Sequence, residues 1–95
     1  MDSQINQIII DTTLPYKPKE IGVFGSYARN EMGPDSDIDI IVDLNEDVSL
    51  FDIGGLYMDL TEKLGKKIDL VTKGGINEVF KKYIERDLIS IYREG

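Results

Sequence analysis

The chain has 95 residues, a length that fits a single domain over residues 1–95 with one modest core. It contains no Cys and no His, which excludes disulfides and thiol catalysis and means that any bound metal is held by oxygen, as Mg²⁺, Mn²⁺ and Ca²⁺ are. The formal net charge of −7 disfavours binding to a long nucleic acid, which needs a basic face, but permits a nucleotide held through a cation.

The N-terminal segment predicts a short helix. Ser3 fits the N-cap position, and Pro15 ends the helix because proline disrupts helical hydrogen bonding. The isoleucines of this segment have the spacing of an apolar helical stripe: Ile5, Ile8 and Ile9. Residues 20–24 then predict a strand that leads directly into Gly25-Ser26 and one or two helical turns.

Residues 37–44 follow a turn at residues 33–36 and predict a strand with two unlike faces. Because successive side chains of a strand point to opposite sides, alternate residues share a face. The apolar face carries Ile38, Ile40, Val42 and Leu44. The other face carries Asp37, Asp39, Ile41 and Asp43. We expect the first face to pack on the core.

A long helix is predicted from Ser49 as N-cap, with Asp52 in the capping-box position, to Gly65 as the C′ residue. Its expected core stripe is Leu50, Ile53, Leu56, Tyr57, Leu60 and Leu64. Gly54 and Gly55 each cost roughly 1 kcal/mol of helix stability relative to Ala. They either permit close packing or mark a local break.

The remaining chain predicts a strand at residues 67–72, a helix after Gly74-Gly75 and a last strand at residues 88–92. The apolar side of the helix consists of Ile76, Val79, Phe80, Tyr83 and Ile84. The sum is an α/β (α+β) domain: one mixed sheet of about four strands with helices on one face. No apolar run approaches 18 residues, and the first ten residues lack a basic region and a cleavage site, so we expect a cytoplasmic protein.

Three carboxylates are candidates for a metal-dependent site. Asp37 and Asp39 share one strand face about 6.6 Å apart, and Asp69 faces away from the core on the strand at 67–72. If the two strands are neighbours, like charges converge, which is unfavourable without a cation or a raised pKa. A two-metal site serves in-line displacement at phosphorus. The plainer reading is a solvated strand face, which we assign to Asp43, about 13 Å from Asp39.

Gly25-Ser26 is a candidate phosphate site. Glycine lets the backbone approach a ligand closely, Ser26 adds a hydroxyl, and Arg29 one helical turn on can reach the same anion. Tyr27 lies next to this site, where it can stack on a base. A Ser N-cap with a surface Arg is the alternative, but the position of Gly-Ser shortly before the Asp-x-Asp strand favours phosphate binding.

Three segments form one combined motif. They read Gly25-Ser26-Tyr27-Ala28-Arg29-Asn30, Ser36-Asp37-Ile38-Asp39-Ile40 and Lys67-Ile68-Asp69-Leu70-Val71. This motif resembles the minimal nucleotidyltransferase (MNT) family of the DNA polymerase β superfamily: Gly-Ser, then Ala-Arg-Gly, a short gap, Ser-Asp-x-Asp and a distant third Asp. The resemblance covers residues 20–72. Asn30 stands where the family often has Gly, and Asn tolerates the left-handed backbone.

The resemblance implies a polymerase β palm-like fold and a role for each matching residue. The catalytic residues, which would also bind two Mg²⁺ ions, are Asp37, Asp39 and Asp69. The residues that would bind the nucleotide are Gly25, Ser26, Arg29 and Ser36. Ser36 would also orient the strand that carries Asp37, and Asp69 would either complete the second metal site or act as base toward the acceptor hydroxyl.

The resemblance also implies partners. It predicts Mg²⁺-dependent transfer of a nucleoside monophosphate, AMP from ATP, to a hydroxyl group. We expect that hydroxyl to belong to a protein partner, because 95 residues leave no room for an acceptor domain. Stand-alone members are often encoded beside a small helical HEPN-type protein, as antitoxin and toxin. Two alternatives stay open: a non-catalytic antitoxin that neutralises its partner by occlusion, and an antibiotic-type nucleotidyltransferase that acts on a small molecule.

Overall fold

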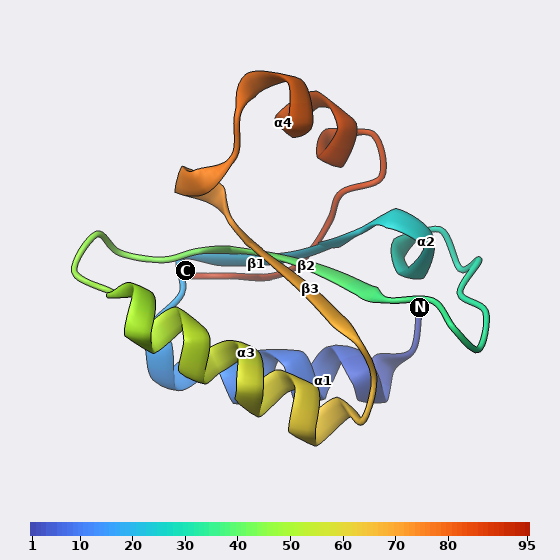
Figure 1. Ribbon diagram of the computed structural model, residues 1–95, viewed down its shortest axis with the longest axis horizontal. Helices are drawn as coiled ribbons and strands as arrows, with labels where there is room; N and C mark the ends of the chain where they lie inside the picture. Colours follow the sequence, from blue (N-terminus) through green and yellow to red (C-terminus); the bar gives the residue numbers. More distant parts are fainter.

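The computed structural model describes all 95 residues, and its helices alternate with its strands (Figure 1). In chain order the elements are α1 (Ser3–Thr13), β1 (Glu20–Phe24), α2 (Gly25–Ala28), β2 (Ile38–Asp43), α3 (Leu50–Leu64), β3 (Ile68–Thr72), α4 (Glu78–Glu85) and β4 (Ile89–Arg93). Short 3₁₀ turns follow α1 at Leu14–Tyr16 and β3 at Lys73–Gly75. No helix of the structure is long and apolar enough to cross a membrane.

The four strands form one mixed sheet, as predicted, and the structure shows their order to be β3-β2-β1-β4. β1 pairs antiparallel with both β2 and β4, whereas β2 pairs parallel with β3. In this register Asp39 lies beside Asp69 on β3 and opposite Phe24 on β1. Residues that are far apart in the sequence therefore meet at one end of the central strands.

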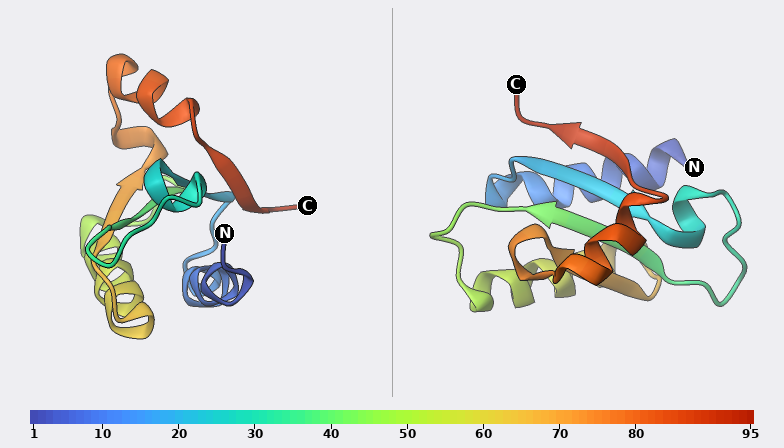
Figure 2. Two further views of the ribbon diagram at one scale, coloured as in Figure 1. Left: turned by 90° about the vertical axis from the view of Figure 1, so that its right-hand side faces the viewer. Right: turned by 90° about the horizontal axis from the view of Figure 1, so that it is seen from above.

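α1 and α3 lie side by side over one face of the sheet (Figures 1 and 2). The residues of β2 that face them, Ile38, Ile40 and Val42, are completely buried together with Leu56 and Leu60 of α3. This arrangement follows the predicted alternation of β2, because one strand face supplies a continuous apolar surface for the two helices.

α4 lies over the opposite face of the sheet (Figure 1), which differs from the expectation that the helices share one face. The reason is a second small cluster in which Ile84 of α4 packs with Phe24 and Ile41. Ile41 was expected among polar neighbours, yet it is 8% exposed. One large apolar residue on an otherwise acidic strand face is enough to require cover, and α4 supplies it.

Local signals explain where the helices begin and end. Asp2, not Ser3, caps α1, because its carboxylate accepts hydrogen bonds from the backbone N–H groups of the first turn. The predicted capping box at Ser49 and the left-handed Gly65 at the end of α3 are confirmed. α3 continues without a break through its two glycines. Leu50 and Tyr57 are solvent-exposed, so their predicted place in the core is wrong.

Candidate active site

The acidic cluster lies where β2 begins, on the sheet face away from α1 and α3. Asp39 sits on β2, and the parallel pairing with β3 sets Asp69 at the same level. Asp37 immediately precedes β2, whose first residue, Ile38, donates its backbone N–H to the Lys67 carbonyl oxygen at 3.0 Å. Asp37 and Asp39 are half-buried, whereas Asp69 is exposed. The predicted neighbourhood of the β2 and β3 carboxylates is therefore present.

Burial and the crowding of like charges both act on the pKa of Asp39. Burial, followed by the negative charges of Asp69 and Asp37 and a hydrogen bond shared with Asp69, raises the pKa of Asp39 from 3.8 to about 6. The Arg29 guanidinium acts in the opposite direction and lowers this pKa. Asp39 is thus the carboxylate with the greatest need for a neighbouring cation.

The acidic side chains do not stand in a ready-made metal geometry, because no group of three is arranged to hold an ion. The chemistry of these residues nevertheless fits a bound metal ion. Asp39 and Asp69 offer only oxygen donors, which Mg²⁺ prefers, and a divalent cation would relieve the repulsion that raises the Asp39 pKa.

Gly25 brings the Gly-Ser segment into contact with the acidic cluster. Its backbone is left-handed, with φ of +68°. A Cβ at this position would lie 2.1 Å from Oδ2 of Asp39, closer than any real contact. Two independent reasons therefore favour glycine at this position: its left-handed backbone and the close approach of the Asp39 side chain. The two motifs that lie apart in the sequence form one site.

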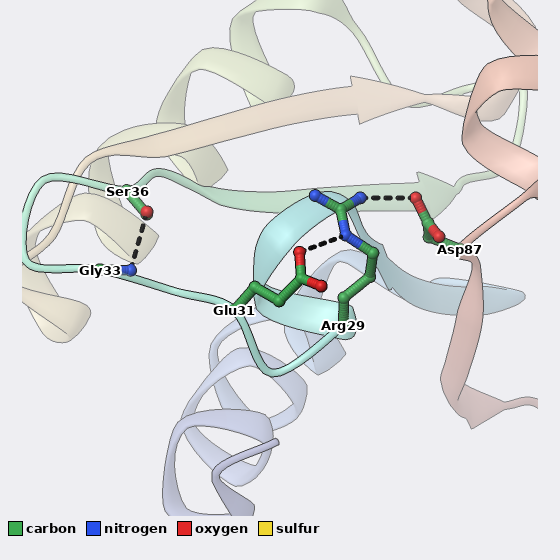
Figure 3. Close-up of polar contacts among 5 residues, drawn as sticks. All are labelled: Arg29, Glu31, Gly33, Ser36 and Asp87. Atoms are coloured by element: carbon green, nitrogen blue, oxygen red, sulfur yellow. Dashed lines mark hydrogen bonds and ion pairs between the residues drawn. The ribbon is translucent and has the colours of Figure 1, made fainter.

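Ser36 closes the turn that precedes Asp37. Its Oγ accepts a hydrogen bond from the Gly33 backbone N–H at 2.9 Å (Figure 3), and its own N–H donates to the Gly33 carbonyl oxygen at 3.2 Å. The Ser36 hydroxyl is engaged within this turn, and its role in orienting the Asp37 strand or binding the nucleotide stays a prediction. Asn30 adopts the left-handed backbone that its position requires, with φ of +59°.

Arg29 bridges two carboxylates on the rim of the site (Figure 3). Its Nε donates to Glu31 at 2.9 Å, and its Nη1 donates to Asp87 at 2.7 Å. Both contacts raise the pKa of Arg29. Asp87 was not among the predicted site residues. No local signal marks it, because its contact with Arg29 exists only when the turn after α4 folds back toward α2.

Tyr27 packs inside the molecule, so it cannot stack on a base. It is 3% exposed, and its hydroxyl lies 2.5 Å from Oδ1 of Asn6 and 3.1 Å from the Asp2 carbonyl oxygen. This contact ties α2 to α1. A hollow between the sheet and α4 has an apolar floor that includes Gly22, Ile41 and Ile84, and a charged rim. None of the three cluster carboxylates lines it.

Comparisons with known proteins show the family of the chain. A family model described as "Nucleotidyltransferase domain" matches residues 5–92. The chain is 51% identical over 77 residues to a Methanocaldococcus jannaschii protein with the provisional name protein adenylyltransferase MJ1217, covering 80% of this chain and 79% of that one. It is 41% identical over 73 residues to protein adenylyltransferase MntA of Thermococcus cleftensis, covering 77% of this chain and 74% of that one.

The fold also matches solved structures. One is a tri-AMPylated Shewanella oneidensis HEPN toxin in complex with MNT antitoxin, with a TM-score of 0.79 and 23% identity over 99% of this chain and 74% of that one. At this level of identity the likeness concerns the fold, a mixed sheet of the same kind with its helices.

Proposed function

Because the chain belongs to the nucleotidyltransferase domain family, we propose that it transfers AMP from ATP to a hydroxyl group on a protein partner. The observation that carries this proposal is the meeting of Asp39, Asp69 and Gly25 at one point of the fold. Relatives named protein adenylyltransferase support the choice of a protein as acceptor.

The nucleotide phosphates would bind at the start of α2. The backbone of Gly25 comes close to Asp39 because glycine has no side chain, and the half-buried Ser26 follows it with a hydroxyl. Arg29 lies one turn on and acts electrostatically on Asp39, so a phosphate near that carboxylate is also near the guanidinium. To bind phosphate fully, Arg29 would exchange one of its two carboxylate partners, Glu31 or Asp87, for the ligand.

Asp37, Asp39 and Asp69 would hold Mg²⁺, which supplies positive charge for the phosphates and for the leaving pyrophosphate when bound. The residues themselves set the direction of approach. Asp69 is exposed and Asp39 is half-buried, so an acceptor reaches the site from the Asp69 side. Asp69 would take the proton of the acceptor hydroxyl as its oxygen bonds to the α-phosphorus and the bond to pyrophosphate breaks.

The proposed acceptor is a tyrosine hydroxyl of a HEPN-type toxin, which would make this chain an antitoxin. The support is the fold shared with the MNT antitoxin that was solved in complex with a tri-AMPylated HEPN toxin. A reaction that consumes nucleoside triphosphate fits the expected cytoplasmic location.

A second candidate is neutralisation of the partner by occlusion without transfer. The observation that favours it is the apolar surface of α4 next to the site, where Val79 is 82% and Tyr83 is 55% exposed. Such a surface binds a protein whether or not the carboxylates act. The two candidates predict the same complex but different chemistry.

The test is the intact mass of this chain and of a HEPN-type protein encoded beside it, after incubation with ATP and Mg²⁺. The double variant Asp37→Asn with Asp39→Asn runs in parallel. We expect one or more AMP additions on the HEPN-type protein, absent with the variant. A tight complex without any mass gain would overturn protein nucleotidyl transfer and support occlusion.

A further inference from the structure

The outer face of α3 carries an apolar stripe that no other part of the chain covers. Its members follow the helical spacing i, i+1, i+4, i+7 and i+8: Leu50, Phe51, Gly54, Tyr57 and Met58. Leu50, Phe51 and Met58 are 87%, 90% and 69% exposed. Single apolar residues at a surface are ordinary, whereas a contiguous stripe on one helix marks an interaction surface.

The stripe is centred on a glycine that the fold of one chain does not explain. Glycine inside a helix lowers its stability relative to alanine. For Gly55 the chain supplies a reason, because a Cβ there would lie 3.3 Å from the Tyr16 hydroxyl. A Cβ on Gly54 would meet nothing within 4 Å. At the exposed centre of an apolar stripe, the missing side chain leaves room for the backbone of another helix.

The spacing of the stripe is symmetric about Gly54, which identifies the other helix. If a second copy of α3 crosses antiparallel at Gly54, Leu50 faces Met58 of the second copy, and Phe51 faces its Tyr57. A two-fold interface needs this self-complementarity, because every contact in it occurs twice. We propose that the α3 stripe is the interface of a homodimer whose two-fold axis passes close to Gly54.

The size of the stripe sets the expected strength. Four apolar side chains of this size can cover roughly 500 Å² per copy, or about 1,000 Å² in total, which is near the lower limit for a specific interface. The net charge of −7 on each copy opposes association, and salt screens it, with a Debye length of about 8 Å at physiological ionic strength. We therefore expect a reversible dimer that becomes tighter as salt is raised.

The dimer would leave both acidic clusters open. α3 lies with α1 on one face of the sheet, and α4 lies on the other (Figures 1 and 2). Asp39 alternates along β2 with the buried Ile38 and Ile40, so it belongs to the face away from α1 and α3. The inference therefore stands apart from the proposed function, and neither depends on the other.

Sedimentation equilibrium over a concentration series tests the dimer. The mass should rise from the 10.7 kDa of one chain toward twice that value. Phe51→Glu places a charge in the stripe and should weaken the dimer by about tenfold or more. Val79→Glu is the matched control, because Val79 is 82% exposed on α4, and it should leave the dimer unchanged. A monomer at every concentration, or a dimer that Val79→Glu disrupts and Phe51→Glu does not, would overturn the proposal.

Cross-linking tests the position of the axis. The chain has no cysteine, so introduced thiols report only the contacts between them, and a disulfide requires Cβ atoms about 3.5–4.5 Å apart. In the proposed dimer Leu50 faces Met58 of the second copy, whereas within one helix these positions are about 12 Å apart. We expect mild oxidation to cross-link two copies of the double variant Leu50→Cys with Met58→Cys efficiently, and the cross-link to be lost when Phe51→Glu is added. The control is Leu50→Cys alone, which has no thiol opposite it in the proposed dimer. Equal yields from the double and the single variant would contradict an axis at Gly54.

Discussion

The two faces of β2 show how one strand can serve stability and chemistry at once. Toward α1 and α3, Ile38, Ile40 and Val42 are completely buried. Toward α4, the same strand carries Asp39 among two other carboxylates, and its pKa is raised to about 6 by burial and by their charges. The first face stabilises the fold through apolar burial. The second face places like charges together, which opposes folding and prepares the site for a cation.

The largest expected effect is on activity from the acidic face. Asp39→Asn should lower the rate of AMP transfer by roughly 10³-fold or more, because a ligand of the catalytic cation is lost. Asp43→Asn is the matched control, since Asp43 is half-buried on the same strand face and its carboxylate forms an ion pair with Lys73 at 3.9 Å. The rate of AMP incorporation measures both variants. Equal losses in the two would contradict the assignment of the site.

The apolar face should dominate stability. Ile40→Ala should lower the free energy of unfolding by about 4 kcal/mol, because Ile40 is completely buried in the main core. Ile41→Ala, one residue on and in the small cluster with Phe24 and Ile84, should lower it by about 2 kcal/mol. Urea denaturation followed by circular dichroism gives both values. A larger loss for Ile41→Ala would reverse the comparison of the two faces.

Alanine substitutions at Gly25 and Gly65 distinguish the effect of backbone strain from the effect of damage to the site. Both have left-handed backbones, with φ of +68° and +62°. Alanine at either position should lower the free energy of unfolding by about 1–2 kcal/mol. A Cβ at Gly65 meets nothing within 4 Å, whereas one at Gly25 collides with Asp39. Gly25→Ala should therefore abolish AMP transfer, whereas Gly65→Ala should keep it. If both variants keep the activity of the unmodified protein, this expectation is wrong.

Asp87 should have a small effect on nucleotide binding. Asp87→Asn removes a negative charge that competes with phosphate for Arg29, so the KM for ATP should fall roughly two- to five-fold. Because exposed ion pairs are screened, the change should shrink at high salt. Glu85→Gln removes an exposed acid nearby and serves as the control. A rise in KM for Asp87→Asn would instead mean that Asp87 positions Arg29 for its ligand.

The sequence was a good guide wherever a pattern is local. The alternation of β2, the capping box at Ser49 and the glycine at the end of α3 each depend on neighbouring residues, and the structure has all three. The meeting of Asp39 with Asp69 was foreseen because both lie on strands whose apolar neighbours fix the direction of the side chain.

The errors arose where a helix face meets something outside its own segment. Leu50 and Tyr57 fit an apolar stripe, but the stripe of α3 is wider than the surface that the sheet can cover. α4 was placed on the wrong face because Ile41 was read with its acidic neighbours. Asp87 was missed because its contact with Arg29 depends on the tertiary fold. Periodicity identifies an apolar face but not its partner.

The central claim is that the acidic face of β2 opposes folding until a cation binds. Asp39 has a pKa of about 6 in the folded protein and an ordinary value of 3.8, so stability is lost as the pH rises from about 4 to 6. Asp39→Asn removes this loss. At pH 7.5 it should raise the free energy of unfolding by about 1 kcal/mol, a value reduced for solvent screening, and at pH 4 the gain should vanish.

The most direct measurement is the melting temperature of the unmodified protein and of Asp39→Asn at pH 7.5, with EDTA and with Mg²⁺. We predict that Asp39→Asn melts at the higher temperature in EDTA, and that Mg²⁺ stabilises the unmodified protein but has little effect on the variant. If Asp39→Asn melts at the lower temperature in EDTA, or if Mg²⁺ stabilises both proteins equally, the acidic face does not act as a cation site centred on Asp39.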